Sequence, residues 1–235
     1  MNRDKYQAVD RVVEVALLLG DLAGQCVFVG GAATGLLLTD PATPNVRPTL
    51  DVDVIVELTT TGELYRLQDA LRARGFMEDM ESKVICRWRH HPIILDVMPT
   101  KPEILGFANR WYPNAVRYAH ERSIDGVRLR FVSPAYFLAT KLEAFHGRGG
   151  GDYMASHDME DFIAVLDGRL EIVDDVAGAD IEVQYYLADQ FDTLLSDDDF
   201  LDALPGHLPG DAASQARVPL IIERMKSISA LKAVR

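Results

Sequence analysis

The sequence has few of the features that mark secreted or membrane proteins. Its 235 residues contain two cysteines, Cys26 and Cys86, too few for a disulfide framework. No apolar run approaches the 18 residues that a membrane-spanning helix needs, and residues 1–6 lack the apolar core of a signal peptide. We therefore expect a cytoplasmic protein without a membrane partner, whose two cysteines are buried free thiols.

Positive charge is missing from one long stretch. Between Glu171 and Asp211 there are 12 Asp and Glu residues and no Lys or Arg, which accounts for the whole formal net charge of −12. Such a run is typical of a solvated helical face. It argues against a nonspecific binder of nucleic acid, because phosphate contacts need Lys and Arg.

Hydrophobic periodicity predicts mainly strands before residue 132 and helices after it. This order indicates an α+β fold: a mixed β-sheet with flanking helices over residues 1–132, including an N-terminal helix, then a helical domain over 133–235. Residues 111–122 fit neither pattern clearly. The predicted helices cover residues 4–23, 32–38, 61–74, 134–146 and 156–166, and the predicted strands cover 25–29, 50–56, 83–89, 92–98 and 127–132.

Two acidic residues lie inside a strand-like segment. Asp51 and Asp53 belong to Leu-Asp-Val-Asp-Val-Ile-Val, whose apolar residues are mostly β-branched. Residues two apart on a strand point to the same face, so the two carboxylates lie side by side. Neighbouring like charges are costly unless a cation lies between them. Mg²⁺, with Mn²⁺ as a substitute, suits such oxygen ligands, and it often completes its shell with substrate phosphates.

A third acid, Asp96, lies in the apolar run Ile-Ile-Leu-Asp-Val-Met. A buried carboxylate needs a partner or a metal, so either a salt bridge or a metal site fits this position. If its strand neighbours the Asp51–Asp53 strand, three carboxylates converge. Such a trio serves two-metal phosphoryl or nucleotidyl transfer, in which ions stabilise the attacking and leaving oxygens.

A glycine pair, Gly30-Gly31, follows the predicted strand 25–29 and opens the predicted helix 32–38. Glycines at such a junction let backbone amides approach phosphate oxygens near a helix N-terminus. A tight turn that needs two glycines explains the pair equally well.

These motifs together resemble the nucleotidyltransferase fold of the DNA polymerase β superfamily. Gly-Gly-Ala-Ala-Thr, from Gly30 to Thr34, and Arg-Pro-Thr-Leu-Asp-Val-Asp, from Arg47 to Asp53, look most like the AbiEii-type toxin branch. The resemblance implies that Asp51, Asp53 and Asp96 are the catalytic metal ligands. It also implies that Gly30, Gly31, Thr34 and Arg47 contact the nucleotide.

A second motif extends the resemblance into the helical half. Lys141-Leu-Glu-Ala-Phe-His-Gly-Arg148, followed by His157-Asp158-Met-Glu-Asp161, is similar to a block that follows the sheet in that family. By this resemblance Lys141, Arg148 and Asp158 bind the nucleoside triphosphate. A surface position for Lys141 and a salt bridge of Arg148 or Asp161 stay open as interpretations.

The leading hypothesis is a Mg²⁺-dependent nucleotidyltransferase that moves a nucleotide from a nucleoside triphosphate to an acceptor hydroxyl. The toxin branch implies RNA, tRNA in particular, as the acceptor and a cognate antitoxin as a partner. The acidic stretch fits a cationic small molecule such as an aminoglycoside instead. A non-catalytic nucleotide sensor that kept the fold is the third hypothesis.

Overall fold

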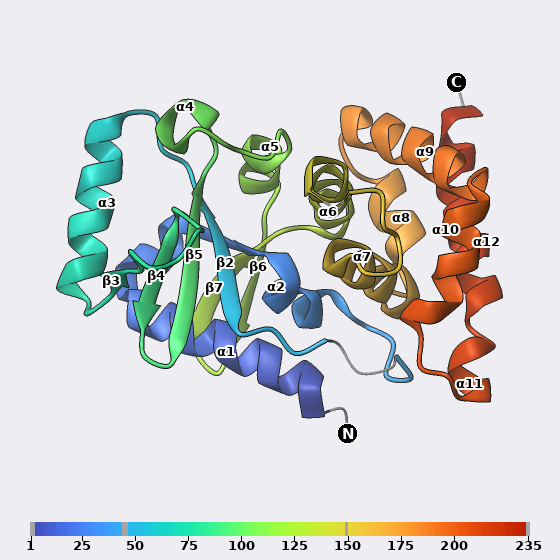
Figure 1. The fold of residues 1–235 in the computed structure, drawn as a ribbon, viewed down its shortest axis with the longest axis horizontal. Helices are drawn as coiled ribbons and strands as arrows, with labels where there is room; N and C mark the ends of the chain where they lie inside the picture. Colours follow the sequence, from blue (N-terminus) through green and yellow to red (C-terminus); the bar gives the residue numbers. More distant parts are fainter. Residues whose placement is uncertain (1–2, 44–46, 149, 234–235) are drawn as a thin grey trace. The chain divides into compact units, whose positions relative to one another are not determined.

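The computed structural model describes residues 3–43, 47–148 and 150–233, and the chain divides into two compact units (Figure 1). The sheet unit comprises Arg3–Leu36 and Pro48–Ser133. The helical unit comprises Leu37–Arg47 and Pro134–Arg235. One junction, between Ser133 and Pro134, falls one residue after the boundary that hydrophobic periodicity indicates. The other two enclose the segment Leu37–Arg47, which overlaps the proline-rich stretch Thr39–Pro48.

One seven-stranded mixed sheet forms the centre of the sheet unit, and it confirms the predicted fold class (Figure 1). The strand order is β3-β4-β5-β2-β1-β7-β6. Pairs β1–β7 and β2–β5 are parallel, while β1–β2, β3–β4, β4–β5 and β6–β7 are antiparallel. The strands are β1 (Cys26–Val29), β2 (Asp51–Val56), β3 (Met77–Glu78), β4 (Arg87–His90), β5 (Ile93–Pro99), β6 (His120–Ile124) and β7 (Val127–Phe131).

Helices flank this sheet, and their ends follow local sequence signals. Helix α3 begins with a capping box, in which the Thr60 hydroxyl accepts from the Glu63 amide and the Glu63 carboxylate accepts from the Thr60 amide. Its C-terminal Arg74 donates to the carbonyl of Leu19, which joins α3 to the end of α1. The helices of this unit are α1 (Arg3–Leu19), η1 (Gly20–Gln25), α2 (Gly30–Leu37), α3 (Thr61–Ala73), α4 (Pro102–Leu105) and α5 (Tyr112–Arg117).

Two details differ from the predicted strands. The strand predicted over residues 83–89 begins only at Arg87, because residues before it form a turn in which the Arg87 amide donates to the carbonyl of Val84. The ambiguous residues 111–122 contain both the short helix α5 and the start of β6. Short elements of this kind carry too little periodicity to be separated by pattern.

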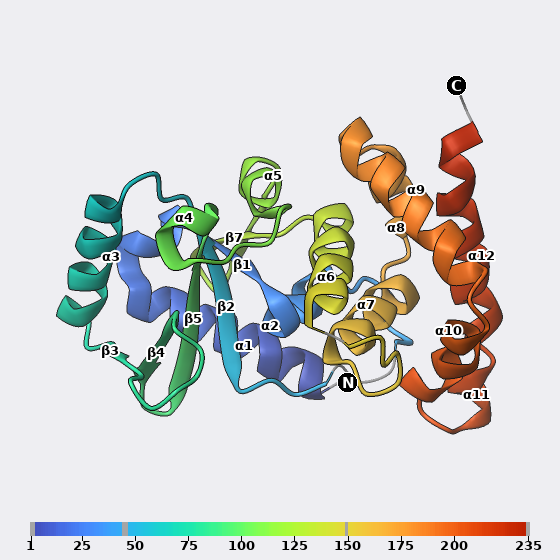
Figure 2. The same cartoon turned by 45° about the horizontal axis from the view of Figure 1, so that its top comes forward.

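Helix α6 of the helical unit (Figure 2) is apolar and mostly buried, and it contacts α7, α8 and α9. Ser156 caps α7, as predicted, by accepting a hydrogen bond from the amide of Met159. Phe137, Phe162 and Phe191 are fully buried in the core of the unit. The helices of the unit are α6 (Pro134–Arg148), α7 (His157–Gly168), α8 (Ile172–Ala177), α9 (Ile181–Leu195), α10 (Asp198–Ala203), η2 (Leu204–His207), α11 (Ala212–Gln215), α12 (Val218–Ser229) and η3 (Ala230–Ala233).

The acidic residues of the stretch Glu171–Asp211 lie at helix caps and on exposed helix faces. None of its 12 acidic residues is buried, and nine are exposed. Asp180, Asp197 and Asp211 each accept a hydrogen bond from a backbone amide at the start of a helix. The solvated character that the charge run indicates is confirmed.

The segment after α2 is part of the helical unit. The backbone amides of Thr39 and Asp40 both donate to the carbonyl of Gly168, each at 2.9 Å, and so satisfy the C-terminal end of α7. Arg217 then bridges the carboxylates of Asp40 and Asp167, at 2.6 Å from each. This early segment therefore supports a helix more than 100 residues further along the chain.

Two further sequence-based expectations concern thiols and membranes. Cys26 and Cys86 are buried and free, as predicted, and burial raises the pKa of each thiol to about 12. Within the residues that the structure describes, no helix has the length and apolarity to cross a membrane.

Candidate active site

The three strand carboxylates lie on one face of the sheet. Asp53 on β2 and Asp96 on β5 are register partners in a parallel pair, so their backbones are about 5 Å apart. Asp51 precedes Asp53 by two residues on the same strand and points to the same face. The structure thus brings together the three acidic residues that the sequence analysis predicted to converge.

A guanidinium group lies among these carboxylates. Arg87 is the antiparallel register partner of Asp96. Its Nε lies 2.8 Å from Asp96 Oδ1, and its Nη2 lies 2.7 Å from Asp96 Oδ2 and 3.0 Å from Asp51 Oδ2. Asp96 is only 5% exposed, so the partner that burial requires is supplied by a bidentate arginine. These hydrogen bonds with Asp96 raise the pKa of Arg87, which stays charged.

Gly30 makes room for the Asp53 carboxylate. Its φ is +67°, and a Cβ built on it meets Asp53 Oδ2 at 1.9 Å, so no other residue fits there without moving that carboxylate. The structure therefore explains the first glycine of the pair by both its turn and its close approach to an acid. Gly31 is buried behind it in α2.

Asp51 is fixed from the loop side. The hydroxyl of Thr49 lies 2.6 Å from Asp51 Oδ1, and Arg11 of α1 donates to the Thr49 carbonyl at 2.8 Å. Thr34, the other nucleotide-contact candidate on α2, is fully buried, and its hydroxyl has no hydrogen-bond partner among the described residues. As placed, Thr34 is closed to solvent.

The cluster is suited to hold one divalent cation with two carboxylates, and not with all three. In the described part of the chain, no three His, Cys, Asp or Glu side chains are placed to hold a metal ion. Asp51 and Asp53 share one face, and the missing side chain of Gly30 leaves room for the Asp53 carboxylate. Each carboxylate offers about four lone-pair positions, and Mg²⁺ is often held by one or two carboxylates plus phosphates. The residues present therefore fit a cation that arrives with a nucleotide.

The second predicted set forms an ion-pair network within the helical unit. The Lys141 ammonium lies 2.6 Å from Asp161 Oδ2 and 3.2 Å from Asp158 Oδ1. Arg148 donates hydrogen bonds to both carboxylate oxygens of Asp158, each at 3.0 Å. Lys141 is buried, at 7% exposed, so it is not a surface lysine. The anion that a buried lysine needs is supplied by this network.

Arg47 belongs to the same network. It lies 3.6 Å from Asp161 and 3.4 Å from Glu160. Burial opposes ionisation of Asp158, but Arg148 and Lys141 outweigh it and lower the pKa of that carboxyl. Four of the predicted residues thus gather in one place, yet as partners of one another. A role for them in binding nucleotide stays a prediction.

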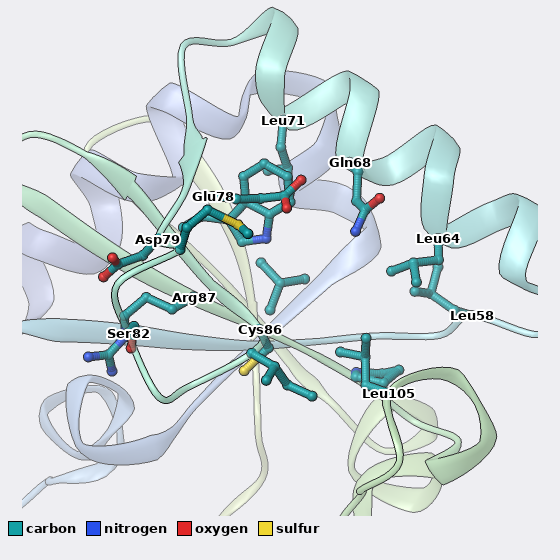
Figure 3. A pocket seen from close by; sticks show the side chains of 15 residues that line it. Leu58, Leu64, Gln68, Leu71, Glu78, Asp79, Ser82, Cys86, Arg87 and Leu105 are labelled. Carbon is teal, nitrogen blue, oxygen red and sulfur yellow. The ribbon is translucent and has the colours of Figure 1, made fainter.

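A pocket of about 330 Å³ lies beside β4 and β5, under α3 (Figure 3). Leu64, Gln68 and Leu71 project into it from α3, and Cys86 lies at its opposite side. None of the three strand carboxylates lines it. Arg87 lines it, so the pocket borders the charged cluster without including its carboxylates.

Arg87 is the residue whose role the sequence did not reveal. Its neighbour Trp88 is buried, at 4% exposed, and lies opposite Leu95, so it packs across the strands and does not form a base-stacking patch with Arg87 and Arg89. The alternation Arg-Trp-Arg places Arg87 and Arg89 on one face of β4, and only the register with β5 places Asp96 on that same face.

Similarity to known proteins is found among solved structures. No family model and no curated protein matches the sequence. Among solved structures, the chain is similar to an antigenic nucleotidyltransferase-like protein from Paracoccidioides brasiliensis, at 20% identity and a TM-score of 0.47, over 83% of this chain and 92% of that one. At that degree of likeness, the chemistry has to be argued from the carboxylate cluster itself.

Proposed function

We propose that the protein is a nucleotidyltransferase whose reaction centre is the cluster Asp51, Asp53, Asp96 and Arg87. The observation that carries the proposal is the placement of three carboxylates on one sheet face, with a glycine reserved for one of them. Carboxylates this close together repel one another, and a bound cation relieves that repulsion. The resemblance of the surrounding motifs to nucleotidyltransferases supplies the reaction class.

In this proposal an acceptor hydroxyl attacks the α-phosphorus of a nucleoside triphosphate and pyrophosphate leaves. Asp51 and Asp53 would hold Mg²⁺, or Mn²⁺ in its place, which when bound neutralises phosphate charge and polarises the reacting oxygens. Thr49 orients Asp51, and Gly30 lets Asp53 keep its position. Arg87 orients the Asp96 carboxylate through two hydrogen bonds.

Two acceptor classes deserve direct comparison. The AbiEii-type resemblance favours RNA, tRNA in particular, together with a cognate antitoxin. The nine exposed acids of the stretch Glu171–Asp211 favour a cationic small molecule, because a negative surface attracts positive ligands and repels polynucleotides. We regard the small cation as the acceptor with more physical support on the protein itself.

The decisive experiment offers Mg²⁺ and each of four α-³²P-labelled nucleoside triphosphates to the full chain, with total tRNA or a panel of aminoglycosides. Label transfer that Asp53→Asn abolishes is the expected result. Transfer to aminoglycosides alone, or to tRNA alone, identifies the acceptor class. Nucleotide binding without transfer under every condition would instead establish the sensor hypothesis.

The matched control is Asp79→Asn. Asp79 is also an acid beside β4, but its carboxylate pairs with Arg89 at 2.6 Å, away from the cluster. A loss of transfer in Asp53→Asn but not in Asp79→Asn assigns the chemistry to the cluster. Equal losses in both would point to a general effect on folding.

A further inference from the structure

The guanidinium of Arg87 occupies a bridging position between two carboxylates. One nitrogen atom, Nη2, contacts Asp96 Oδ2 at 2.7 Å and Asp51 Oδ2 at 3.0 Å. One guanidinium nitrogen thus contacts two carboxylates from different strands. It occupies the position between them that a bridging metal ion would otherwise occupy. In two-metal sites, such ions lie about 3.5–4 Å apart.

The charges of the cluster lead to the same point. Arg87 already places one positive charge between Asp51 and Asp96. A second divalent ion between Asp51 and Asp96 would have to share that space with a guanidinium that is always charged.

From this geometry we infer that Arg87 takes the place of a second metal ion, so that the site binds a single divalent cation with each nucleotide. The inference rests on the proposed function and makes it more specific. Asp53 and Asp51 are the ligands, and Asp96 is the anchor of Arg87 rather than a ligand. Arg87 is thus a positioning residue that sets the number of metal ions.

Counting bound ions tests this without measuring activity. The full chain is dialysed to equilibrium against Mn²⁺ and the non-hydrolysable α,β-methylene analogue of ATP, GTP, CTP or UTP, and Mn²⁺ is counted per bound nucleotide. The wild type is expected to hold one. Arg87→Gln frees Asp96 and Asp51 together and is expected to hold two, with spin–spin coupling between them in the electron paramagnetic resonance spectrum.

Two variants separate this effect from general damage to the sheet. Arg87→Gln combined with Asp96→Asn removes the charge and the ligand together, leaves no uncompensated acid at that position, and is expected to return the count to one. Arg89→Gln is the matched control, because Arg89 lies two residues further on the same strand and pairs with Asp79 instead. It is expected to hold one ion.

The outcomes distinguish the inference from the proposal that it deepens. Two ions in the wild type, or one in Arg87→Gln that stays folded by circular dichroism, would overturn the single-metal inference and leave a nucleotidyltransferase standing. Failure of every nucleotide to bring Mn²⁺ to the wild type, or binding unchanged in Asp53→Asn, would overturn both.

Discussion

Half-buried Arg87 in the sheet unit and buried Lys141 in the helical unit each bind two aspartates, yet their surroundings differ. Around Arg87, three carboxylates face one guanidinium. Around Lys141, the described network has three acids, Asp158, Glu160 and Asp161, and three bases. Crowded carboxylates favour a bound cation, whereas paired acids and bases stabilise the fold. The local arrangement of charge thus separates a candidate active site from a structural cluster.

The net charge of each unit does not follow the charge of the cluster inside it. The sheet unit has 16 Asp and Glu against 15 Lys and Arg, and the helical unit has 20 against 9. The nearly neutral unit holds the negative cluster, and the strongly acidic unit holds the neutral network. Net charge informs about the ligands that a surface attracts, but the chemistry depends on the few charges that share a site.

The largest expected effect breaks the unbalanced cluster. Asp53→Asn should reduce nucleotide transfer about 10²–10³-fold, the usual loss when one preorganised electrostatic group is removed. Single-turnover transfer measures the loss, and urea denaturation of the same preparations shows that the variant is folded. A variant that transfers at the wild-type rate would show that the imbalance has no catalytic meaning.

The balanced network should respond in stability instead. Lys141→Met leaves Asp161 and Asp158 buried without their ammonium partner and should lower the free energy of unfolding by about 3–5 kcal/mol. Lys232→Met is the control: Lys232 pairs with Asp189 at the surface, and such pairs contribute about 0–1 kcal/mol. If Lys141→Met keeps its stability but raises KM for the nucleotide, the nucleotide-binding role that the sequence suggested is correct.

The close approach of Gly30 to Asp53 offers a subtler test of the cluster. Gly30→Ala and Gly106→Ala both place an L-residue at positive φ, at a cost of about 1–2 kcal/mol each. Only at Gly30 does the new Cβ meet a carboxylate, since nothing lies within 4 Å at Gly106. Mn²⁺ affinity in the presence of nucleotide should therefore fall about tenfold in Gly30→Ala and stay unchanged in Gly106→Ala. Equal affinities in the two variants would remove Gly30 from the site.

The smallest effect concerns acid. The pKa of Asp158 is held below its ordinary 3.8 by Arg148 and Lys141 against the opposing effect of burial. A depressed pKa stabilises the fold above the unfolded value and loses that contribution as pH falls through the folded value. The stability difference between wild type and Asp158→Asn should be constant from pH 5 to 7 and shrink below about pH 4. Denaturation at a series of pH values measures it, and a difference independent of pH would contradict the ion pairing.

The strand carboxylates could be predicted from the sequence because period and composition agree. Asp51 and Asp53 interrupt a β-branched run at a spacing of two, and Asp96 interrupts another. Their convergence needed only that the two strands be neighbours. The helix caps at Thr60 and Ser156 follow from the same kind of local rule.

What the sequence did not reveal depends on register between distant segments. Arg87 faces Asp96 because of the pairing of β4 with β5, and a slip of one residue would turn it to the face of Trp88. Likewise, Lys141 meets Asp158 and Asp161 only once α6 and α7 are packed together. Partners fixed by tertiary packing leave no periodic signal in either segment.

The segment Leu37–Arg47 makes the helical unit discontinuous along the chain. A fragment cut at residue 134 would lose Thr39 and Asp40, whose amides satisfy the carbonyl of Gly168, and the Asp40 carboxylate that Arg217 binds. Likewise, deleting the first half of the chain removes part of the second half's own structure. The two units are therefore interleaved during synthesis: the ribosome releases a piece of the helical unit first, and it stays without its partners until α7 and α12 have been made.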